Sequence, residues 1–188
     1  MSKINTYPTF LYGKESWNNN WKHSWNTITH LSASGRVRSL THQLYPSVET
    51  YLYYPHLTDE EADKLQGFFN ICRGSSKFFW YKDYQRSLMK NQVLARAADG
   101  TYRLVMNIGE FLEPVFKADI IEVRIDGVKT IAFTEKDGVL TIADTTPEKV
   151  VTADYNCYLK CYLKDDNTII RRNFKNSNNA SVTLCVAR

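Results

Sequence analysis

Four histidines are the first residues to consider for chemistry, because imidazole ligates metals and transfers protons near neutral pH. They are His23, His30, His42 and His56. They fall in different predicted elements, and the sequence has no HxH or HExxH spacing that would place two imidazoles beside one metal ion. We therefore predict no metal site and no cofactor.

Carboxylates and nucleophiles do not form a catalytic pattern either. The segment Asp165-Asp166-Asn167 resembles half of a calcium-binding loop, but the glycine and the later glutamate of such a loop are absent from it. Asp83 follows a predicted buried strand, where an acidic side chain commonly accepts hydrogen bonds from turn amides. The sequence also has no GxSxG, GxxxxGK(S/T) or GxGxxG pattern. We therefore predict that the protein is not an enzyme.

The cysteines show no pairing pattern. They are Cys72, Cys157, Cys161 and Cys185, and no two of them form a CxxC pair. Two of the four lie in one predicted strand, where a separation of four residues spans about 13 Å. We predict that all four are buried free thiols.

Length and composition indicate a globular chain. Its 188 residues, 43% hydrophobic and 23% charged, predict a single domain over residues 1–188 with an extended N-terminal segment at about 1–22. Aromatic residues make up 13%, which favours strands and contact surfaces. The net charge of +4 is too mild, and its basic residues too scattered, for sequence-specific DNA binding. No window resembles a membrane span or a secretory leader, so we expect synthesis in the cytosol and no membrane insertion.

One helix is predicted at about 58–73. Thr58 and Glu61 have the spacing of a capping box, and Gly74 lies where helices commonly end. The apolar residues recur at steps of three and four, which places them on one face. These residues are Ala62, Leu65, Phe68, Phe69 and Cys72.

Short strands are predicted over much of the remaining chain. They lie at 25–31, 36–45, 48–54, 78–81, 93–97, 102–106, 111–116, 120–125, 131–134, 139–142, 150–163, 168–174 and 182–186. Residues 6–12, which Pro8 interrupts, are expected to be either an edge strand or an arm that lies against a neighbour. Pro55 is expected to end one of them, and residues 175–179 are expected to be a polar loop. Three Asp-Gly pairs favour tight reversals between neighbouring strands. The predicted fold is mainly β, an antiparallel β-sandwich or barrel with one flanking helix.

Aromatic residues indicate candidate contact surfaces. Neither face of the strand at 36–45 is cleanly apolar, as in a sheet that lies against a partner chain. The loop at 17–21 is either a surface turn with anchoring tryptophans or a subunit contact. The candidate subunit-contact residues are Trp17, Trp21, Trp25, Tyr51, Tyr53, Tyr158 and Tyr162.

The order of several segments resembles a known family. Residues 69–84 contain Arg73-Gly74 and then Phe79-Trp80-Tyr81-Lys82-Asp83-Tyr84. This segment is similar to a signature of a tailed-phage protein family that includes the distal tail proteins of gene transfer agents. Further similar segments follow in the family's order, and Tyr7-Pro8 and Tyr12-Gly13 are similar to its opening. These further segments are 92–105, 114–127, 138–154 and 158–166.

The resemblance implies a β-sandwich or barrel of the tail-tube type and a structural role in the virion tail. The chain would form a ring, expected to be a hexamer, that joins the tail tube protein to the tail tip or baseplate hub protein. DNA would pass through the lumen without specific binding. Two alternatives remain open: a carbohydrate- or receptor-binding β-sandwich, in which the tryptophans stack on sugars, and a tail tube or tube-terminator subunit.

Overall fold

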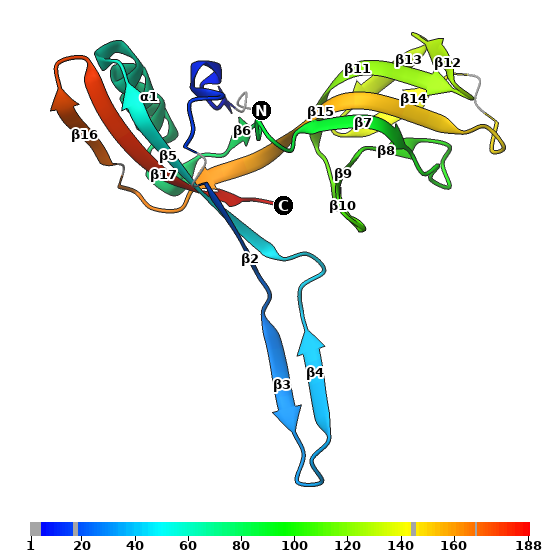
Figure 1. The fold of residues 1–188 in the computed structure, drawn as a ribbon. Helices are drawn as coiled ribbons and strands as arrows, with labels where there is room; N and C mark the ends of the chain where they lie inside the picture. Colours follow the sequence, from blue (N-terminus) through cyan, green and yellow to red (C-terminus); the bar gives the residue numbers. More distant parts are fainter. Residues whose placement is uncertain (1–4, 17–18, 144–145, 168) are drawn as a thin grey trace. The chain divides into compact units, whose positions relative to one another are not determined.

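The computed structural model describes residues 5–16, 19–143, 146–167 and 169–188 (Figure 1). The protein is mainly β, with 54% strand and one α-helix in this described part, which confirms the predicted fold class. Its largest sheet is mixed but mostly antiparallel, and smaller sheets accompany it. The sheet does not close into a barrel, so the barrel alternative is wrong.

The described residues divide into two compact units, and neither unit is one continuous segment. Unit 1 contains residues 5–7 and Phe79–Lys160, and unit 2 contains Pro8–Phe78 and Cys161–Arg188. Strand β15 (Val151–Leu163) contributes residues to both. The single domain predicted for residues 1–188 stays a prediction.

Unit 2 is built around an antiparallel sheet in the order β16–β17–β5–β2. A separate two-stranded sheet, β3–β4, follows β2 in the chain. The strands are β2 (Asn20–Ser24), β3 (Thr27–Leu31), β4 (Val37–Thr41), β5 (Ser47–Leu57), β16 (Ile169–Phe174) and β17 (Ser177–Val186). Its helices are α1 (Asp59–Cys72) and the short 3-10 segments Thr9–Leu11 and Gly74–Ser76.

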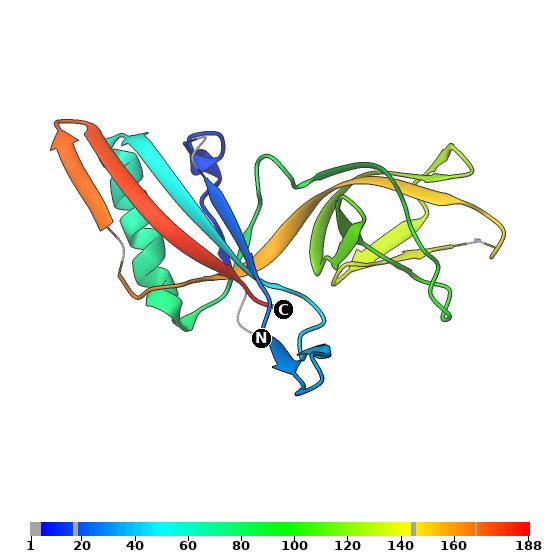
Figure 2. The same cartoon turned by 60° about the horizontal axis from the view of Figure 1, so that its bottom comes forward.

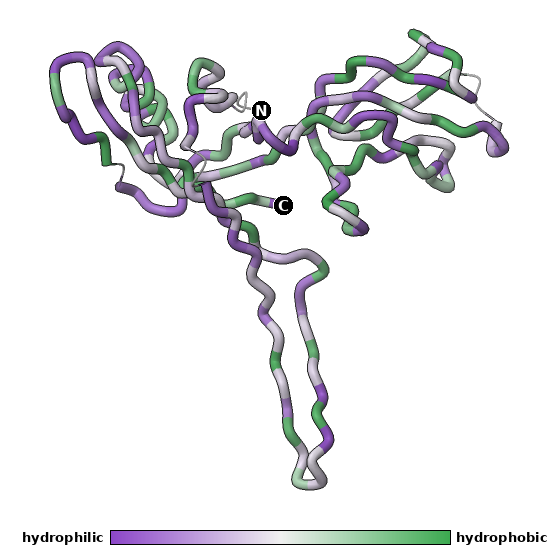
Figure 3. Tube along the Cα trace, viewed as in Figure 1, coloured by the Kyte–Doolittle hydropathy of each residue, from purple (hydrophilic) through white to green (hydrophobic). Residues whose placement is uncertain are grey.

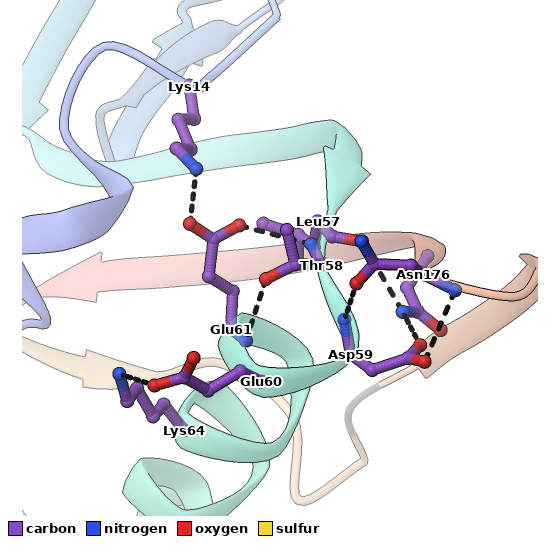
Figure 4. Close-up of polar contacts among 9 residues, drawn as sticks. Lys14, Leu57, Thr58, Asp59, Glu60, Glu61, Lys64 and Asn176 are labelled. Atoms are coloured by element: carbon purple, nitrogen blue, oxygen red, sulfur yellow. Dashed lines mark hydrogen bonds and ion pairs between the residues drawn. The ribbon is translucent and has the colours of Figure 1, made fainter.

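Helix α1 forms as its sequence predicts. Thr58 and Glu61 make the reciprocal bonds of a capping box, in which Glu61 N–H donates to Thr58 Oγ1 at 3.2 Å (Figure 4). The helix ends at Arg73, whose φ of 53° is left-handed, and Gly74 follows with a φ of 63°. Every residue of the predicted apolar face is buried.

That apolar face covers one side of the unit 2 sheet. Figure 2 shows α1 lying along β5, β17 and β16. Leu52 is opposite Val182 across the two central strands, and Thr50 is opposite Leu184. All four of these residues are buried, and Leu65 of the helix is fully buried. Apolar burial between the helix and the sheet therefore forms the core of unit 2.

Asp59 connects the start of α1 to the β16–β17 hairpin. Its carboxylate accepts hydrogen bonds from Asn178 Nδ2 at 2.8 Å, Arg172 Nη2 at 2.9 Å and Asn176 N–H at 3.2 Å. Its own N–H donates to Asn176 Oδ1 at 3.1 Å, so the two segments are joined in both directions (Figure 4). The hydrogen bond from Asn178, followed by those from Arg172 and Asn176, lowers the pKa of Asp59.

Unit 1 contains the remaining strands. β15 pairs with β7 (Leu88–Val93) and β11 (Lys117–Ile125), and β11 pairs with β12 (Val128–Thr130). A second sheet has the order β13–β14–β8 (Phe133–Lys136, Val139–Ile142, Tyr102–Arg103). A third contains β9 (Val105–Ile108) and β10 (Phe111–Pro114). β1 (Asn5–Thr6) pairs in parallel with β6 (Phe79–Tyr81).

Strand β15 shows the predicted alternation along its whole length. Residues of one parity are buried from Val151 to Leu163, and those between them are half-buried. The fully buried Tyr155 also connects two strands of unit 1, because its hydroxyl donates to Val105 O at 2.6 Å. Two of the Asp-Gly pairs form the predicted reversals, with positive φ at both residues of 126–127 and of 137–138.

Several predicted strand boundaries are wrong. β5 continues past Pro55 to Leu57, because Tyr54 pairs with Ala180 and Leu57 pairs with Asn178 of β17. The register shifts between these two pairs, so Pro55 lies in a bulge, where the missing N–H of proline breaks no hydrogen bond between the strands. The segment 6–12 is predicted to be an edge strand or an arm. Only its first residue belongs to a strand, β1, and a 3-10 turn follows Pro8.

Other strand boundaries also differ from the predicted ones, because contacts between distant residues extend or shift strands that the local sequence pattern does not predict. The polar loop predicted at 175–179 ends at Asn176, which adopts a φ of 59°, and β17 begins at Ser177. The strand predicted at 93–97 lies earlier, as β7. The loop predicted at 17–21 overlaps β2, which begins at Asn20.

The Asp59 contacts predict an acid-dependent part of the stability. Folding lowers the pKa of Asp59. Its contribution to the free energy of unfolding is therefore present above the pKa of the unfolded state, about 3.9, and is lost as the pH falls through the pKa of the folded state. The substitution Asp59→Asn keeps the shape but removes the charge. We expect it to lower the melting temperature at pH 7 and to have a smaller effect at pH 3, as measured by circular dichroism.

Asp165→Asn is the matched control, because Asp165 is exposed in the same unit. We expect it to change stability by no more than about 0.5 kcal/mol. An equal loss from Asp59→Asn at both pH values would contradict the charge-assisted role of Asp59.

Candidate functional site

The β3–β4 hairpin contains four of the exposed large hydrophobic residues of unit 2. All residues of both strands are exposed, and Figure 1 shows the hairpin extending beyond the other strands of this unit. Ile28, Leu31, Val37 and Leu40 are 56 to 65% exposed. A two-stranded hairpin is at best marginally stable in water, because it buries little apolar surface of its own. The hairpin is therefore the first candidate for a contact surface.

Both faces of the hairpin contain apolar residues. Opposite residues of an antiparallel pair share a face, so the pairing of Ile28 with Leu40 puts both on one face, and the pairing of Leu31 with Val37 puts both on the other. Hydrophobic and hydrophilic residues accordingly alternate along the hairpin (Figure 3). A single flat surface cannot bury both apolar pairs.

The two faces differ in charge. His30 and Arg38 are paired on the face of Ile28 and Leu40, and Arg36 precedes them at the turn. With Ser32 and Ser34 these side chains line a depression of about 330 Å³ that contains no carboxylate. The face of Leu31 and Val37 presents instead the hydroxyls of Thr29 and Ser39, which lie 3.4 Å apart. One face is therefore basic and the other neutral.

The basic face has no acidic neighbour along the chain. Between Glu15 and Glu49 the sequence contains Lys22, Arg36 and Arg38 but no Asp or Glu. Sequence reasoning indicated a partner contact at the strand 36–45 from its mixed faces, but it named no residue of β3 or β4 as a contact residue. The absence of acidic residues was a further signal that was visible in the sequence.

Three of the predicted contact tyrosines share the sheet face opposite α1. Tyr51 and Tyr53 alternate with the helix-facing residues of β5, and Tyr162 pairs with Cys185, which is itself opposite Glu49. Tyr51 is 39% exposed, and Tyr53 and Tyr162 are half-buried. An ion pair of 2.7 Å between Lys164 and Glu49 lies beside them. This face is the second candidate surface.

The other predicted contact residues do not gather at one place. Trp17 lies outside the described residues. Trp21 is in β2, opposite Thr50 and thus on the helix-covered side, and Trp25 is 49% exposed between β2 and β3. Tyr158 belongs to unit 1, where its hydroxyl donates to Asp119 Oδ2 at 2.5 Å and Lys117 Nζ lies 4.5 Å from its ring centre. The role of all seven residues as subunit contacts stays a prediction.

Side chains that could take part in catalysis or metal binding lie in different elements of the described part of the chain. His23, His30 and His56 lie in β2, β3 and β5, and His42 follows β4. No three described His, Cys, Asp or Glu side chains are grouped so that they could hold a metal ion. The four cysteines are buried and free, as predicted, and burial raises the pKa of Cys157 to about 12. No helix in the described ranges is long and apolar enough to cross a membrane.

Asp83 is a buried carboxyl in unit 1. Its Oδ1 accepts a hydrogen bond from Gln85 N–H at 2.9 Å, which is the turn contact that the sequence predicts. Its Oδ2 is buried without a hydrogen-bond partner among the described residues. Burial raises the pKa of Asp83, and the hydrogen bond from Gln85 opposes this effect.

Comparison with known proteins gives no assignment. No protein-family model matches the chain, and no curated protein matches it.

Asp83 predicts a pH effect of the opposite sign to that of Asp59. Because folding raises the pKa of Asp83, the folded state keeps the proton to a higher pH than the unfolded state does. The free energy of unfolding therefore falls as the pH rises from about 3.9, the pKa of the unfolded state, through the pKa of the folded state. The substitution Asp83→Asn keeps the acceptor for Gln85 N–H and removes the charge. We expect a higher melting temperature at pH 7 and a smaller difference at pH 4.

Asp137→Asn serves as the control and should leave the melting temperature unchanged, because Asp137 is an exposed turn residue of the same unit. A lower melting temperature for Asp83→Asn at pH 7 would show that the carboxylate is required there, and would contradict this account.

Proposed function

We propose that the chain is a structural subunit of a tailed-phage tail, a distal-tail adaptor that forms a ring between the tail tube and the tail tip or baseplate hub. The single observation that supports this proposal best is the β3–β4 hairpin, whose apolar side chains are uncovered in the isolated chain. The resemblance of residues 69–84 and of the segments after them to tailed-phage proteins gives the particular assignment.

The hairpin favours a role in assembly on energetic grounds. Full burial of a Val, Leu or Ile side chain contributes about 1.5–3 kcal/mol, so covering the exposed parts of these four side chains would contribute about 4–7 kcal/mol. Association itself costs about 4–15 kcal/mol. The hairpin alone therefore gives weak binding, and a stable assembly needs further contacts. The tyrosines on the open sheet face are suited to supply them.

A closed ring is compatible with surfaces of this kind. In a ring each subunit uses one surface to contact a different surface of the next subunit, so both surfaces are exposed in the isolated chain. Under this proposal the chain's partners are other copies of itself, expected as a hexamer, the tail tube protein and the tip or hub protein. DNA passes through the lumen without specific contacts, and the protein is made in the host cytoplasm and resides in the virion.

The proposal predicts that the hairpin matters for assembly and not for folding. The double substitution Ile28→Ser, Leu40→Ser removes one exposed apolar pair. Because both side chains are largely exposed, the free energy of unfolding of the monomer should change by no more than about 0.5 kcal/mol per site. Self-association, measured by sedimentation velocity, should weaken by about 100-fold, since each lost contact contributes about 1–2 kcal/mol.

Val128→Ser, Ile131→Ser is the matched control, because these residues of unit 1 are 70% and 88% exposed. It should leave self-association unchanged. If the hairpin variant associated as tightly as the wild type, the hairpin would not be an assembly surface.

The assignment to the tail is tested on particles. An epitope tag at the C-terminus should be located by electron microscopy at the distal end of the tail tube, in a ring of copies. Absence of the chain from purified particles would contradict the proposal. Retention on a glycan array, with loss of binding in Trp25→Ala, would instead favour the carbohydrate-binding alternative.

A further inference from the structure

A groove runs along α1 on the side of β16. It consists of two hollows of about 390 Å³ each, which both include Gln66. Side chains at steps of three and four along the helix line it, so that one helical stripe forms its wall. These are Asp59, Asp63, Gln66, Asn70 and Arg73.

The hollow near the start of α1 is lined by the carboxylates of Asp59 and Asp63, by Arg172, and by the apolar residues Ala62 and Ile170. Arg172 forms an ion pair with Asp59 at 2.9 Å, so the negative charge that remains in this hollow is that of Asp63. Asp59 already accepts three hydrogen bonds from the β16–β17 hairpin. The side chain of Asp63 is exposed and makes no hydrogen bond or ion pair with another described residue. Its carboxylate is therefore available to a cation from outside the chain.

The groove is also bordered by a strand with an unpaired edge. Among the described residues β16 pairs with β17 alone. Such an edge presents N–H and C=O groups that can pair with a strand of another chain. The β3–β4 hairpin likewise has an open edge on each strand in the part of the chain that the structure describes.

The dimensions of the hairpin and of the groove agree. A five-residue strand of the hairpin is about 17 Å long. The 14 residues of α1 extend about 21 Å, and the six residues of β16 about 20 Å. A strand of the hairpin is thus short enough to lie along α1 and β16.

We propose that the β3–β4 hairpin of one copy binds in the α1–β16 groove of a second copy, with Arg36 and Arg38 facing Asp63. This inference deepens the proposed ring and rests on it, because the contact is head to tail between identical chains. Ile28 and Leu40 share the basic face of the hairpin and would cover Ala62 and Ile170 in the groove.

The apolar residues on the basic face favour a protein surface over nucleic acid. A phosphate backbone would satisfy Arg36 and Arg38 but would leave Ile28 and Leu40 exposed to water. The groove offers carboxylate and apolar surface together, which matches the composition of this face. The opposite face of the hairpin, with Leu31 and Val37, remains available for a further contact within the assembly.

Charge reversal tests the contact on the purified full-length protein. Native mass spectrometry should show oligomers of the wild type, and the double variant Arg36→Glu, Arg38→Glu should weaken association about 100-fold, because it places like charges opposite Asp63. Adding Asp63→Arg to that variant should restore association, since every copy then has an acidic hairpin and a basic groove. Circular dichroism should show unchanged folding, because all three residues are exposed.

The matched control is Lys136→Glu, Lys149→Glu, which makes the same change in net charge at exposed positions of unit 1 and should leave association unchanged. Oligomers of Arg36→Glu, Arg38→Glu as stable as the wild type would overturn this inference and leave the proposed ring standing. Loss of association without rescue by Asp63→Arg would also overturn the groove as the binding site. A monomeric wild type would overturn it too, and the particle experiment decides the proposed function independently.

Discussion

The packing of α1 against the unit 2 sheet is the interaction on which the other features of that unit depend. The helix buries its apolar stripe on β5 and β17, with Leu65, Leu52 and Leu184 almost fully enclosed. Because β2 is paired with β5, this core also fixes the strand from which the β3–β4 hairpin continues. The same packing creates the groove between α1 and β16. One hydrophobic contact thus positions both surfaces that we assign to assembly.

The polar contacts around the start of α1 determine where the helix lies along the sheet. Apolar burial alone does not determine how far α1 is displaced along the sheet, since it is non-directional. The capping box at Thr58 and Glu61 sets the first helical turn, and Asp59 joins that turn to the β16–β17 hairpin. These hydrogen bonds therefore hold Asp59, Arg172 and Asn178 together in the lining of the hollow at the start of α1.

Local patterns in the sequence were sufficient for the elements that depend on neighbouring residues. The capping box, the apolar face of α1, the alternation of β15 and the Asp-Gly turns were predictable because each rests on residues close in the chain. The continuation of β5 past Pro55 was not, because a bulge against β17 accommodates the missing N–H. The start of β17 was missed for a similar reason. The polar Asn178 indicates a loop in the sequence, but in the structure it is buried and its side-chain amide donates hydrogen bonds to Leu57 O and Asp59 Oδ1.

The candidate surfaces were only partly visible in the sequence. Aromatic content indicated Tyr51, Tyr53 and Tyr162, which share one sheet face, but it could not identify the hairpin, whose contacts are made by aliphatic and basic residues. Hydrogen–deuterium exchange of the hairpin amides, compared between the monomer and the assembled form, tests the account most directly. We predict slow exchange at 27–31 and 37–41 in the assembled form, because these strands are then covered. Equally fast exchange in both forms would contradict the claim that the hairpin is an assembly surface.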